Sequence, residues 1–381
     1  MNKPEQNNSI HAYQDDALGV KDAVGLVQDL RSGVVSSTEL AQAARKRALR
    51  VDPSIHAITF NRHNHTRIKQ TVVKDRNSQI FFQGIPSYIK DNIAVKGLPT
   101  SYGSDAFKPK AETRHSAYTK QFLATGVNVL GKSALPEFGF NATTEPAHTA
   151  PTRNPWHLDY SSGASSGGSA ALVAAGVVPF AHGNDGGGSI RIPAACCGLV
   201  GLKPSRNRHI NEFAAKTLPI NIVSEGVLTR SVRDTAYFHF ELQKHYRNSK
   251  LPLLPLVTSP NQKRLRVAYF TESVTGFRSD NETQETVLKT AQLLKDAGHQ
   301  VDEIKLAVSA QFAEDFGLEL KGREDVPSAK TSAAFLPIKE SNIELVHPLN
   351  GEGPVQKYLD KKGGGIHHLC FSSDDIHADV E

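Results

Sequence analysis

The strongest constraint on the fold comes from residues 163–201, where 10 glycines in 39 residues are interleaved with serine, alanine and apolar runs. A flexible linker is also rich in glycine and serine, but it does not carry long apolar runs. Here the runs AALVAAGVVPF and SIRIPAACCGLVGL include or follow the glycines. Because glycine has no side chain, this pattern predicts a close-packed region where backbone approaches backbone or a ligand.

The N-terminal part of the chain has helical periodicity. Residues 1–16 are polar and are interpreted as a loose leader. Apolar residues then recur at helical spacing as far as Gly33, which predicts a first helix. A capping box at Ser36 and Glu39 predicts a second helix, and we expect Pro53 to stop it.

Strands and helices alternate farther along the chain. Residues 84–100 predict short strands joined by turns, and residues 117–130 predict a helix followed by a buried strand. A strand, a helix and a second strand are then predicted at 264–270, 283–297 and 299–306. This alternation is typical of an α/β fold with a parallel or mixed sheet.

Composition excludes several classes of protein. The 381 residues carry 44 basic and 39 acidic side chains, a net charge of +5 with both signs interleaved, so nothing favours nucleic acid or an anionic membrane. No segment is long and apolar enough to span a membrane, and three cysteines cannot build a disulfide framework. We expect a cytoplasmic protein with a small-molecule partner, and homo-oligomerisation stays open.

A candidate nucleophile follows three consecutive glycines. In the segment NDGGGSIRIP, Ser189 comes directly after Gly186, Gly187 and Gly188. Successive glycine N–H groups can form a nest for an anion, such as the oxyanion that forms when a serine attacks a carbonyl. The segment matches neither common phosphate-binding fingerprint, and on its own it also fits a plain turn.

A serine nucleophile needs a base, and the 16 histidines stand in no recognisable triad signature. Lys90, in the segment SYIKDN, is a candidate because burial lowers the pKa of a lysine, although a surface position fits this residue as well. The turn GASSGG contains Ser165 and Ser166. One of these two serines can relay a proton between the lysine and the nucleophile, or both can be structural.

These segments together resemble the amidase signature family. The resemblance rests on IKDN around Lys90, GASSGGSAA around Ser165 and GNDGGGSIRIPAACCGLVGLKPS around Ser189. The segments GKSALPEFG and TRSVRDTA match as well, in the expected order. The resemblance covers about residues 16–317.

The resemblance implies an α/β fold whose mixed β-sheet core is flanked by helices. It also implies hydrolysis of a small-molecule amide without a cofactor, with Ser189 as nucleophile, Ser165 on a cis peptide bond as proton relay, and Lys90 as base. The oxyanion would be bound by backbone N–H groups, and two side chains would brace the loop. The residues so implied are Gly186, Gly187, Gly188 and Ser189 for the oxyanion, and Asp185 and Arg191 for bracing.

Residues 324–381 do not continue the amidase pattern. They resemble methylmalonyl-CoA epimerase of the glyoxalase-like vicinal oxygen chelate superfamily, which implies a partial βαβββ segment, and the residues predict a hairpin at 333–348 with a Lys-Glu-Ser-Asn turn. That superfamily binds a divalent metal with four side chains. Glu344 and His368 fall at two of these positions, so we expect a metal only if this segment is functional.

The two resemblances predict a division of the chain into a leader (1–16), an amidase domain (17–317) that lacks its C-terminal third, a junction (318–323) and an epimerase-like segment (324–381). A gene fusion, a rearrangement and a sequence artefact all fit this division. Three alternatives to a working amidase stay open: a catalytically compromised remnant, a metal-dependent epimerase-like isomerase and a glutamine-amidotransferase-type subunit.

Overall fold

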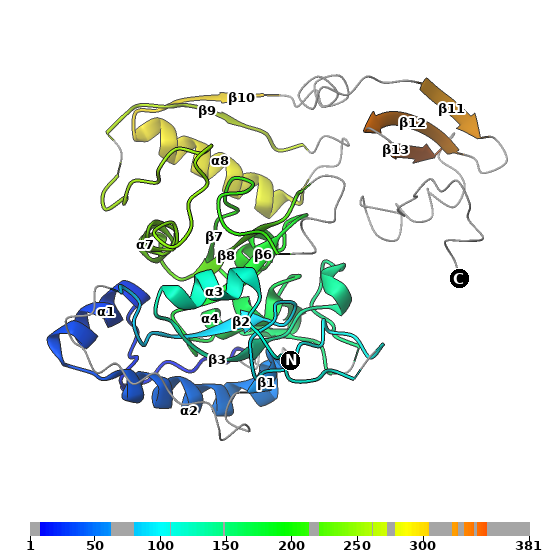
Figure 1. Cartoon of the computed structure of the whole chain (residues 1–381). Helices are drawn as coiled ribbons and strands as arrows, with labels where there is room; N and C mark the ends of the chain where they lie inside the picture. The colour runs from blue at the N-terminus through cyan, green and yellow to red at the C-terminus, as the bar shows by residue number, and fades with distance from the viewer. Residues whose placement is uncertain are drawn as a thin grey trace, which may run out of the picture. The chain divides into compact units, whose positions relative to one another are not determined.

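The computed structural model describes residues 8–61, 80–106, 108–147, 149–212, 221–260, 262–272 and 279–304, and the backbone of 322–326, 331–338 and 341–348. The chain divides into two compact units, Met1–Pro260 and Asn261–Glu381. The division falls inside the predicted amidase domain 17–317. Figure 1 labels most of the elements of both units.

The first helix ends, and the second helix begins, at a residue that the sequence marks. Helix α1 (Ala23–Ser32) ends at Gly33, which has a left-handed backbone conformation. Helix α2 (Ser37–Ile55) begins with the predicted capping box. The Glu39 N–H donates to Ser36 Oγ at 3.2 Å, and the Ser36 N–H donates to the Glu39 carboxylate at 2.8 Å. Both caps satisfy backbone groups that a helix end leaves unpaired.

The expectation that Pro53 stops the second helix is wrong. Pro53 lies inside the last turn of α2, and the helix continues to Ile55. Proline removes one N–H donor, which weakens a helix but does not end it when packing holds the next turn. Val51 and Ile55 are both fully buried in the core, and this packing keeps the last turn helical.

The remaining described helical segments of the first unit are short. They are α3 (Ala117–Ala124), the 3₁₀ turn η2 (Glu137–Gly139), α4 (Gly167–Ala174), α5 (Arg191–Cys196) and α7 (Val232–Leu242). The strands are β1 (Ile58–Asn61), β2 (Pro86–Lys90), β3 (Asn128–Ser133), β4 (Arg153–Asn154), β5 (His157–Ser161), β6 (Phe180–Asp185), β7 (Val200–Gly201) and β8 (Ser224–Thr229).

The sheet strands are mixed in direction. Strand β3 lies between β1, which is antiparallel to it, and β2, which is parallel to it, while β8 pairs antiparallel with β6 and β7. Strands β2 and β6 lie side by side, since Ser87 Oγ donates to Phe180 O at 3.0 Å. Helix α2 packs on β2 and β3, and α4 packs on β2, β6 and β8. This arrangement confirms the predicted α/β fold class.

The glycine-rich region is close-packed, as its composition predicts. All residues of α4 are buried. A Cβ at Gly168 would lie 2.4 Å from Ala134 N and 2.7 Å from Ala57 O, both backbone atoms. Only glycine allows α4 to approach these segments so closely, and this approach places the turn before α4 next to the end of β2.

The described part of the predicted leader is attached to the first unit rather than loose. The Ile10 N–H donates to Pro155 O at 2.8 Å, and the Ala12 N–H donates to Ala175 O at 2.6 Å. Ala12 is fully buried. Polar composition does not reveal these contacts, because backbone groups make two of them and a single small apolar side chain makes the third.

The second unit confirms two expectations. Strand β9 (Arg266–Tyr269), helix α8 (Asn281–Asp296) and strand β10 (Gln300–Glu303) form the predicted strand–helix–strand unit, with β9 and β10 parallel. Strands β11 (Gly322–Val326), β12 (Thr331–Ile338) and β13 (Ser341–Pro348) form an antiparallel sheet. Strands β12 and β13 are the predicted hairpin, with Ile338 opposite Ser341, so Ser341 and Asn342 belong to the strand and not to the expected turn.

Candidate active site

Lys90 occupies the end of strand β2 and is fully buried. Its Nζ donates to Ser165 Oγ at 2.7 Å and to Asn184 Oδ1 at 2.7 Å. Burial disfavours the ammonium form and lowers the pKa of Lys90 to about 7, although the negative charges of Glu225 and Asp185 act in the opposite direction. The surface position that the sequence also allowed is therefore excluded.

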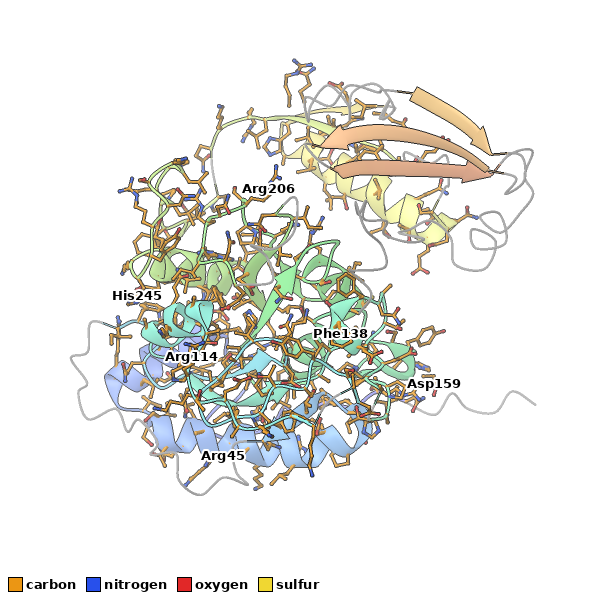
Figure 2. All side chains as sticks on the ribbon, turned by 45° about the vertical axis from the view of Figure 1, so that its right-hand side comes forward. Arg45, Arg114, Phe138, Asp159, Arg206 and His245 are labelled. Carbon is orange, nitrogen blue, oxygen red and sulfur yellow. The ribbon has the colours of Figure 1, made fainter. Side chains whose placement is uncertain are left out.

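Ser165 lies in the turn before α4, and its peptide bond with Ala164 is cis, as the resemblance implies. The side chain is buried, and its Oγ accepts the hydrogen bond from Lys90. Gly139 lies beside it, since a Cβ there would stand 3.4 Å from Ser165 Oγ. Phe138, labelled in Figure 2, precedes Gly139 and is exposed, so this side of the site borders the surface.

Ser189 follows the glycine turn that joins β6 to α5 and is half-buried. The Ser166 N–H donates to Ser189 O at 3.3 Å, which holds the turn of Ser165 against the turn of Ser189. Gly187 is exposed, and no atom of the described residues beyond its chain neighbours lies within 4 Å of where its Cβ would be. The tertiary structure thus brings together three segments whose central residues are 75 and 24 positions apart. Lys90 contacts Ser165, and Ser166 contacts Ser189.

One of the four backbone N–H groups expected to bind the oxyanion is already hydrogen-bonded within the turn. The Gly188 N–H donates to Asp185 Oδ1 at 2.9 Å, so this group is directed toward a buried carboxylate. A donor engaged in this way does not serve an anion on the open side of the turn. The candidate donors that remain are the N–H groups of Gly186, Gly187 and Ser189.

A buried Asp185 and a half-exposed Arg191 hold the turn that carries Ser189. Arg191 Nε and Nη2 each donate to the Asp185 carboxylate at 2.9 Å, and the Ile190 N–H donates to it at 3.2 Å. Burial alone would raise the pKa of Asp185, but the hydrogen bonds from Arg191 and the loop N–H groups lower it to about 2. The carboxyl is therefore ionised at neutral pH and pairs with the guanidinium.

Lys203 is a bracing residue that the sequence analysis did not single out. Its Nζ donates to Gly186 O at 2.8 Å and to Ile222 O at 2.7 Å, and it lies 3.5 Å from Asp185 Oδ1. Lys203 belongs to the segment CCGLVGLKPS that carries the resemblance. Its position in this segment was the one feature of the sequence that could have pointed to its contact with the glycine turn.

Three more polar residues beside Lys90 received no role from the sequence: His182, Asn184 and Glu225. They stand in strands β6 and β8 and carry no motif of their own, so no sequence signal gave them a role. The Lys90 N–H donates to His182 Nδ1 at 3.2 Å, and His182 Nε2 lies 2.9 Å from Glu225 Oε2. Burial raises the pKa of Glu225 above its ordinary value, while the charge of Lys90 and a hydrogen bond from Asn184 lower it.

The structure describes the backbone position of one of the two expected metal ligands. Glu344 lies on β13, opposite Phe335 of β12, and His368 lies outside the described residues. Among the described residues, no group of three or more His, Cys, Asp or Glu side chains is placed to bind a metal ion. A search of the same residues finds no helix whose length and apolar character would let it cross a membrane.

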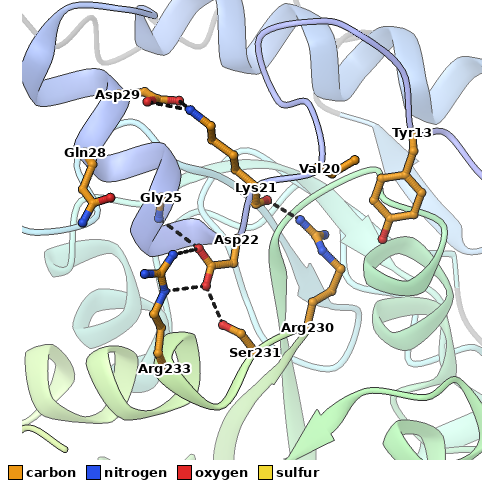
Figure 3. Close-up of a pocket in the computed structure, with 10 residues that line it drawn as sticks. All are labelled: Tyr13, Val20, Lys21, Asp22, Gly25, Gln28, Asp29, Arg230, Ser231 and Arg233. Atoms are coloured by element: carbon orange, nitrogen blue, oxygen red, sulfur yellow. Dashed lines mark hydrogen bonds and ion pairs between the residues drawn. The ribbon is translucent and has the colours of Figure 1, made fainter. Parts of the chain in front are cut away.

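A surface pocket of about 630 Å³ lies elsewhere on the first unit, at the N-terminal ends of α1 and α7 (Figure 3). Its charged residues already bind each other: Arg233 Nη2 donates to Asp22 at 2.6 Å, and Lys21 Nζ donates to Asp29 at 2.6 Å. Arg230 Nη2 donates to Lys21 O at 2.6 Å. The contacts of Arg233 and Arg230 join the N-terminal ends of the two helices, and none of the predicted site residues lines the pocket.

The arrangement around Lys90 and the two serines defines a class of protein, and comparison with known families agrees. The chain belongs to the amidase family: the model described as Amidase matches residues 39–330. Residues 298–381 match the model of the Glyoxalase/Bleomycin resistance protein/Dioxygenase superfamily. The amidase match extends past Pro260, so the second structural unit begins within the amidase sequence.

Individual relatives support the same family. A Mycobacterium tuberculosis protein named AmiC is 48% identical over 310 residues, which cover 81% of this chain and 65% of the relative. The structure of 6-aminohexanoate cyclic dimer hydrolase has a TM-score of 0.63 at 31% identity, with 76% of this chain and 61% of that chain covered. A bacterial aryl acylamidase of the amidase signature enzymes has a TM-score of 0.64 at 27% identity, with 77% and 63% covered. The chain thus spans somewhat less than two thirds of the length of these relatives.

Proposed function

We propose that this chain hydrolyses carboxamides through an acyl-enzyme on Ser189. The observation that carries the proposal is the buried Lys90, whose Nζ lies 2.7 Å from Ser165 Oγ. Burial brings the pKa of Lys90 to about 7, so a large share of the amine is neutral at neutral pH. A neutral buried amine beside a hydroxyl is the arrangement a serine hydrolase without histidine needs, because the base must accept a proton.

The reaction takes place in two halves. In the first, Ser189 Oγ attacks the amide carbon, its proton passes to Ser165, and the Ser165 proton passes to Lys90. The N–H groups of Gly186, Gly187 and Ser189 bind the oxyanion. When the C–N bond breaks, the proton returns from Lys90 through Ser165 to the leaving amine, which departs from the acyl-serine ester.

In the second half, water attacks the ester carbon, and its proton takes the same route through Ser165 to Lys90. The C–O bond to Ser189 then breaks, the proton returns to Ser189 Oγ, and the carboxylic acid is released. Every step moves protons among this chain's own side chains, so the reaction uses no cofactor. A cyclic dimer hydrolase and an aryl acylamidase are among the structural neighbours, and their names support a small amide as the substrate class.

A fluorophosphonate probe tests the proposal, because it reacts covalently with an activated serine. We expect labelling at Ser189 in the full chain and its loss in Ser189→Ala. In Lys90→Ala we expect the labelling rate to fall by about 100-fold or more, the usual contribution of a general base. Ser205→Ala is the matched control, since Ser205 is an exposed serine outside the site, and it should label like the unmodified chain.

Two results would contradict the proposal. A chain that unfolds cooperatively but shows no labelling at Ser189 would support a catalytically compromised remnant. Labelling that survives Lys90→Ala unchanged would remove the lysine from the mechanism. A screen of simple amides, including glutamine, then separates a general amidase from an amidotransferase-type activity.

A further inference from the structure

The network behind Lys90 places three polar side chains on one face of the sheet. Asn184 of β6 lies directly opposite Glu225 of β8, and cross-strand partners project to the same side of a sheet. His182 is two residues before Asn184, so the alternation along β6 places it on that side as well. Lys90 reaches this face from β2 and contacts both β6 residues, through its N–H and through Nζ.

The hydrogen bonds fix the ionisation state of His182. Its Nδ1 accepts the Lys90 N–H at 3.2 Å, so in a neutral ring the proton sits on Nε2, which donates to Glu225 Oε2 at 2.9 Å. Burial, and then the charge of Lys90, keep the pKa of His182 well below its ordinary value. His182 is therefore a neutral donor that orients the Glu225 carboxylate.

The proposed reaction creates a positive charge on Lys90, which lies next to His182 and Asn184. Lys90 becomes an ammonium each time it takes the proton, and it does so while fully buried. The acceptors that contact its Nζ, Ser165 Oγ and Asn184 Oδ1, are both neutral. A buried cation without a counter-charge is strongly disfavoured, so a nearby carboxylate has to balance it.

Glu225 is the acid placed to do so: burial favours its neutral form, but the positive charge of a protonated Lys90 and the hydrogen bond from Asn184 lower its pKa and favour the carboxylate when Lys90 becomes an ammonium. Asp185, the other acid whose charge acts on Lys90, is already paired with Arg191 at 2.9 Å. Glu225 is buried in the core, Lys90 is the cation whose charge acts on it, and Asn184 hydrogen-bonds to both residues. The other charged or titratable groups around the network are the ion pair Lys132–Asp91, Tyr118 beside the His182 ring, and Glu212.

We propose that Glu225 is a positioning residue which, held by His182 and Asn184, supplies the negative charge that stabilises the Lys90 ammonium formed during catalysis. This inference rests on the proposed function, in which Lys90 is the base. Glu225 thus joins Lys90, Ser165 and Ser189 as a residue on which the rate depends, although it touches neither the substrate nor the reacting atoms. Its effect appears in the pH dependence of Ser189 reactivity.

The test is the rate of fluorophosphonate labelling of Ser189 as a function of pH. Labelling rises with pH as Lys90 loses its proton, with a midpoint at the pKa of Lys90. In Glu225→Gln the ammonium loses its counter-charge, so the pKa of Lys90 falls and the midpoint moves to lower pH, by about one unit or more. The plateau rate falls too, because a weaker base accepts the proton less readily.

Two further variants keep the test decisive. Glu225→Met is a second neutral variant of similar length without a polar group to bury, and the shift is expected in whichever neutral variant unfolds cooperatively. Glu225→Asp keeps the charge and should return the midpoint toward that of the unmodified chain. Asp234→Asn is the matched control: Asp234 is a buried carboxylate at the contact between α7 and α1, where it accepts from the Ala23 and Val24 N–H groups.

The outcomes separate this inference from the proposed function. A midpoint that shifts in Glu225→Gln or Glu225→Met but stays in place in Asp234→Asn supports the inference. A lower rate with an unchanged midpoint in the neutral variants overturns it, since a purely structural role lowers the rate equally at every pH. Absence of labelling in the unmodified chain overturns the proposed function itself, and this inference with it.

Discussion

Replacing Asp185 by asparagine is expected to weaken the turn that carries Ser189. The carboxylate accepts hydrogen bonds from the Gly188 N–H at 2.9 Å, the Ile190 N–H at 3.2 Å and two guanidinium nitrogens of Arg191 at 2.9 Å. Asparagine keeps one oxygen and replaces the other with a donor. That donor faces N–H groups, so at least one hydrogen bond is replaced by a contact between two donors.

The size of the effect follows from the pKa of Asp185, which falls from an ordinary value of 3.8 to about 2. A difference of one in pKa between the folded and the unfolded state corresponds to about 1.4 kcal/mol. The ionised carboxyl therefore stabilises the fold by about 2 kcal/mol relative to the neutral one. Because the folded-state pKa is lowered, this stability is fully present above pH 3.8 and is lost as the pH falls through about 2. Asparagine resembles the neutral form and should cost about 2 kcal/mol at neutral pH.

The assay is urea unfolding of both proteins at about pH 7 and at about pH 2. We expect a difference in unfolding free energy of about 2 kcal/mol at the higher pH and a clearly smaller one at the lower pH. Asp159→Asn, at an exposed carboxyl that contacts Asn8, is the control and should change stability by less than about 0.5 kcal/mol. A difference that is equal at both pH values would refute the electrostatic argument.

Three other substitutions test the packing and the site. Lys90→Met should keep cooperative unfolding, since it removes a buried amine, and should slow probe labelling of Ser189 by about 100-fold or more; normal labelling would contradict this. Gly168→Ala should destabilise the first unit by several kcal/mol in thermal unfolding, because its Cβ would lie 2.4 Å from Ala134 N; a neutral effect would mean that α4 can move. Ser36→Ala should cost about 1 kcal/mol in urea unfolding, through the lost cap of α2, and Ser32→Ala, near the end of α1, should cost less.

Local chemistry was enough to predict several elements. The capping box of α2 uses atoms only three residues apart, and Gly33 ends α1 because few residues other than glycine adopt a left-handed backbone easily. The strand–helix–strand unit of β9, α8 and β10 follows from apolar periodicity in consecutive segments. In each case the signal and the structure lie within one stretch of chain.

Long-range packing overrode local signals elsewhere. Pro53 is a helix breaker by its own chemistry, yet the burial of Val51 and Ile55 carries α2 past it. The polar residues 8–16 indicate a free terminus, yet backbone contacts with Pro155 and Ala175, far away in the chain, hold them in place. Such contacts leave no periodicity, since they depend on which distant segment lies alongside.

The candidate site divides in the same way. Lys90, Ser165 and Ser189 stand in motifs whose residue types and order already point to serine chemistry, so the sequence could nominate them. His182, Asn184, Glu225 and Lys203 are single polar residues whose roles depend on partners 17 to 135 residues away.

The chain's residues alone therefore settled which chemical groups are available and which family pattern they follow. Three-dimensional packing decided that Lys90 is buried rather than exposed, that the Gly188 N–H binds Asp185, and that the charge of Glu225 acts on Lys90. The reason is physical: a pKa and a hydrogen bond depend on the distances and the dielectric around a group, and only the assembled sheet sets these.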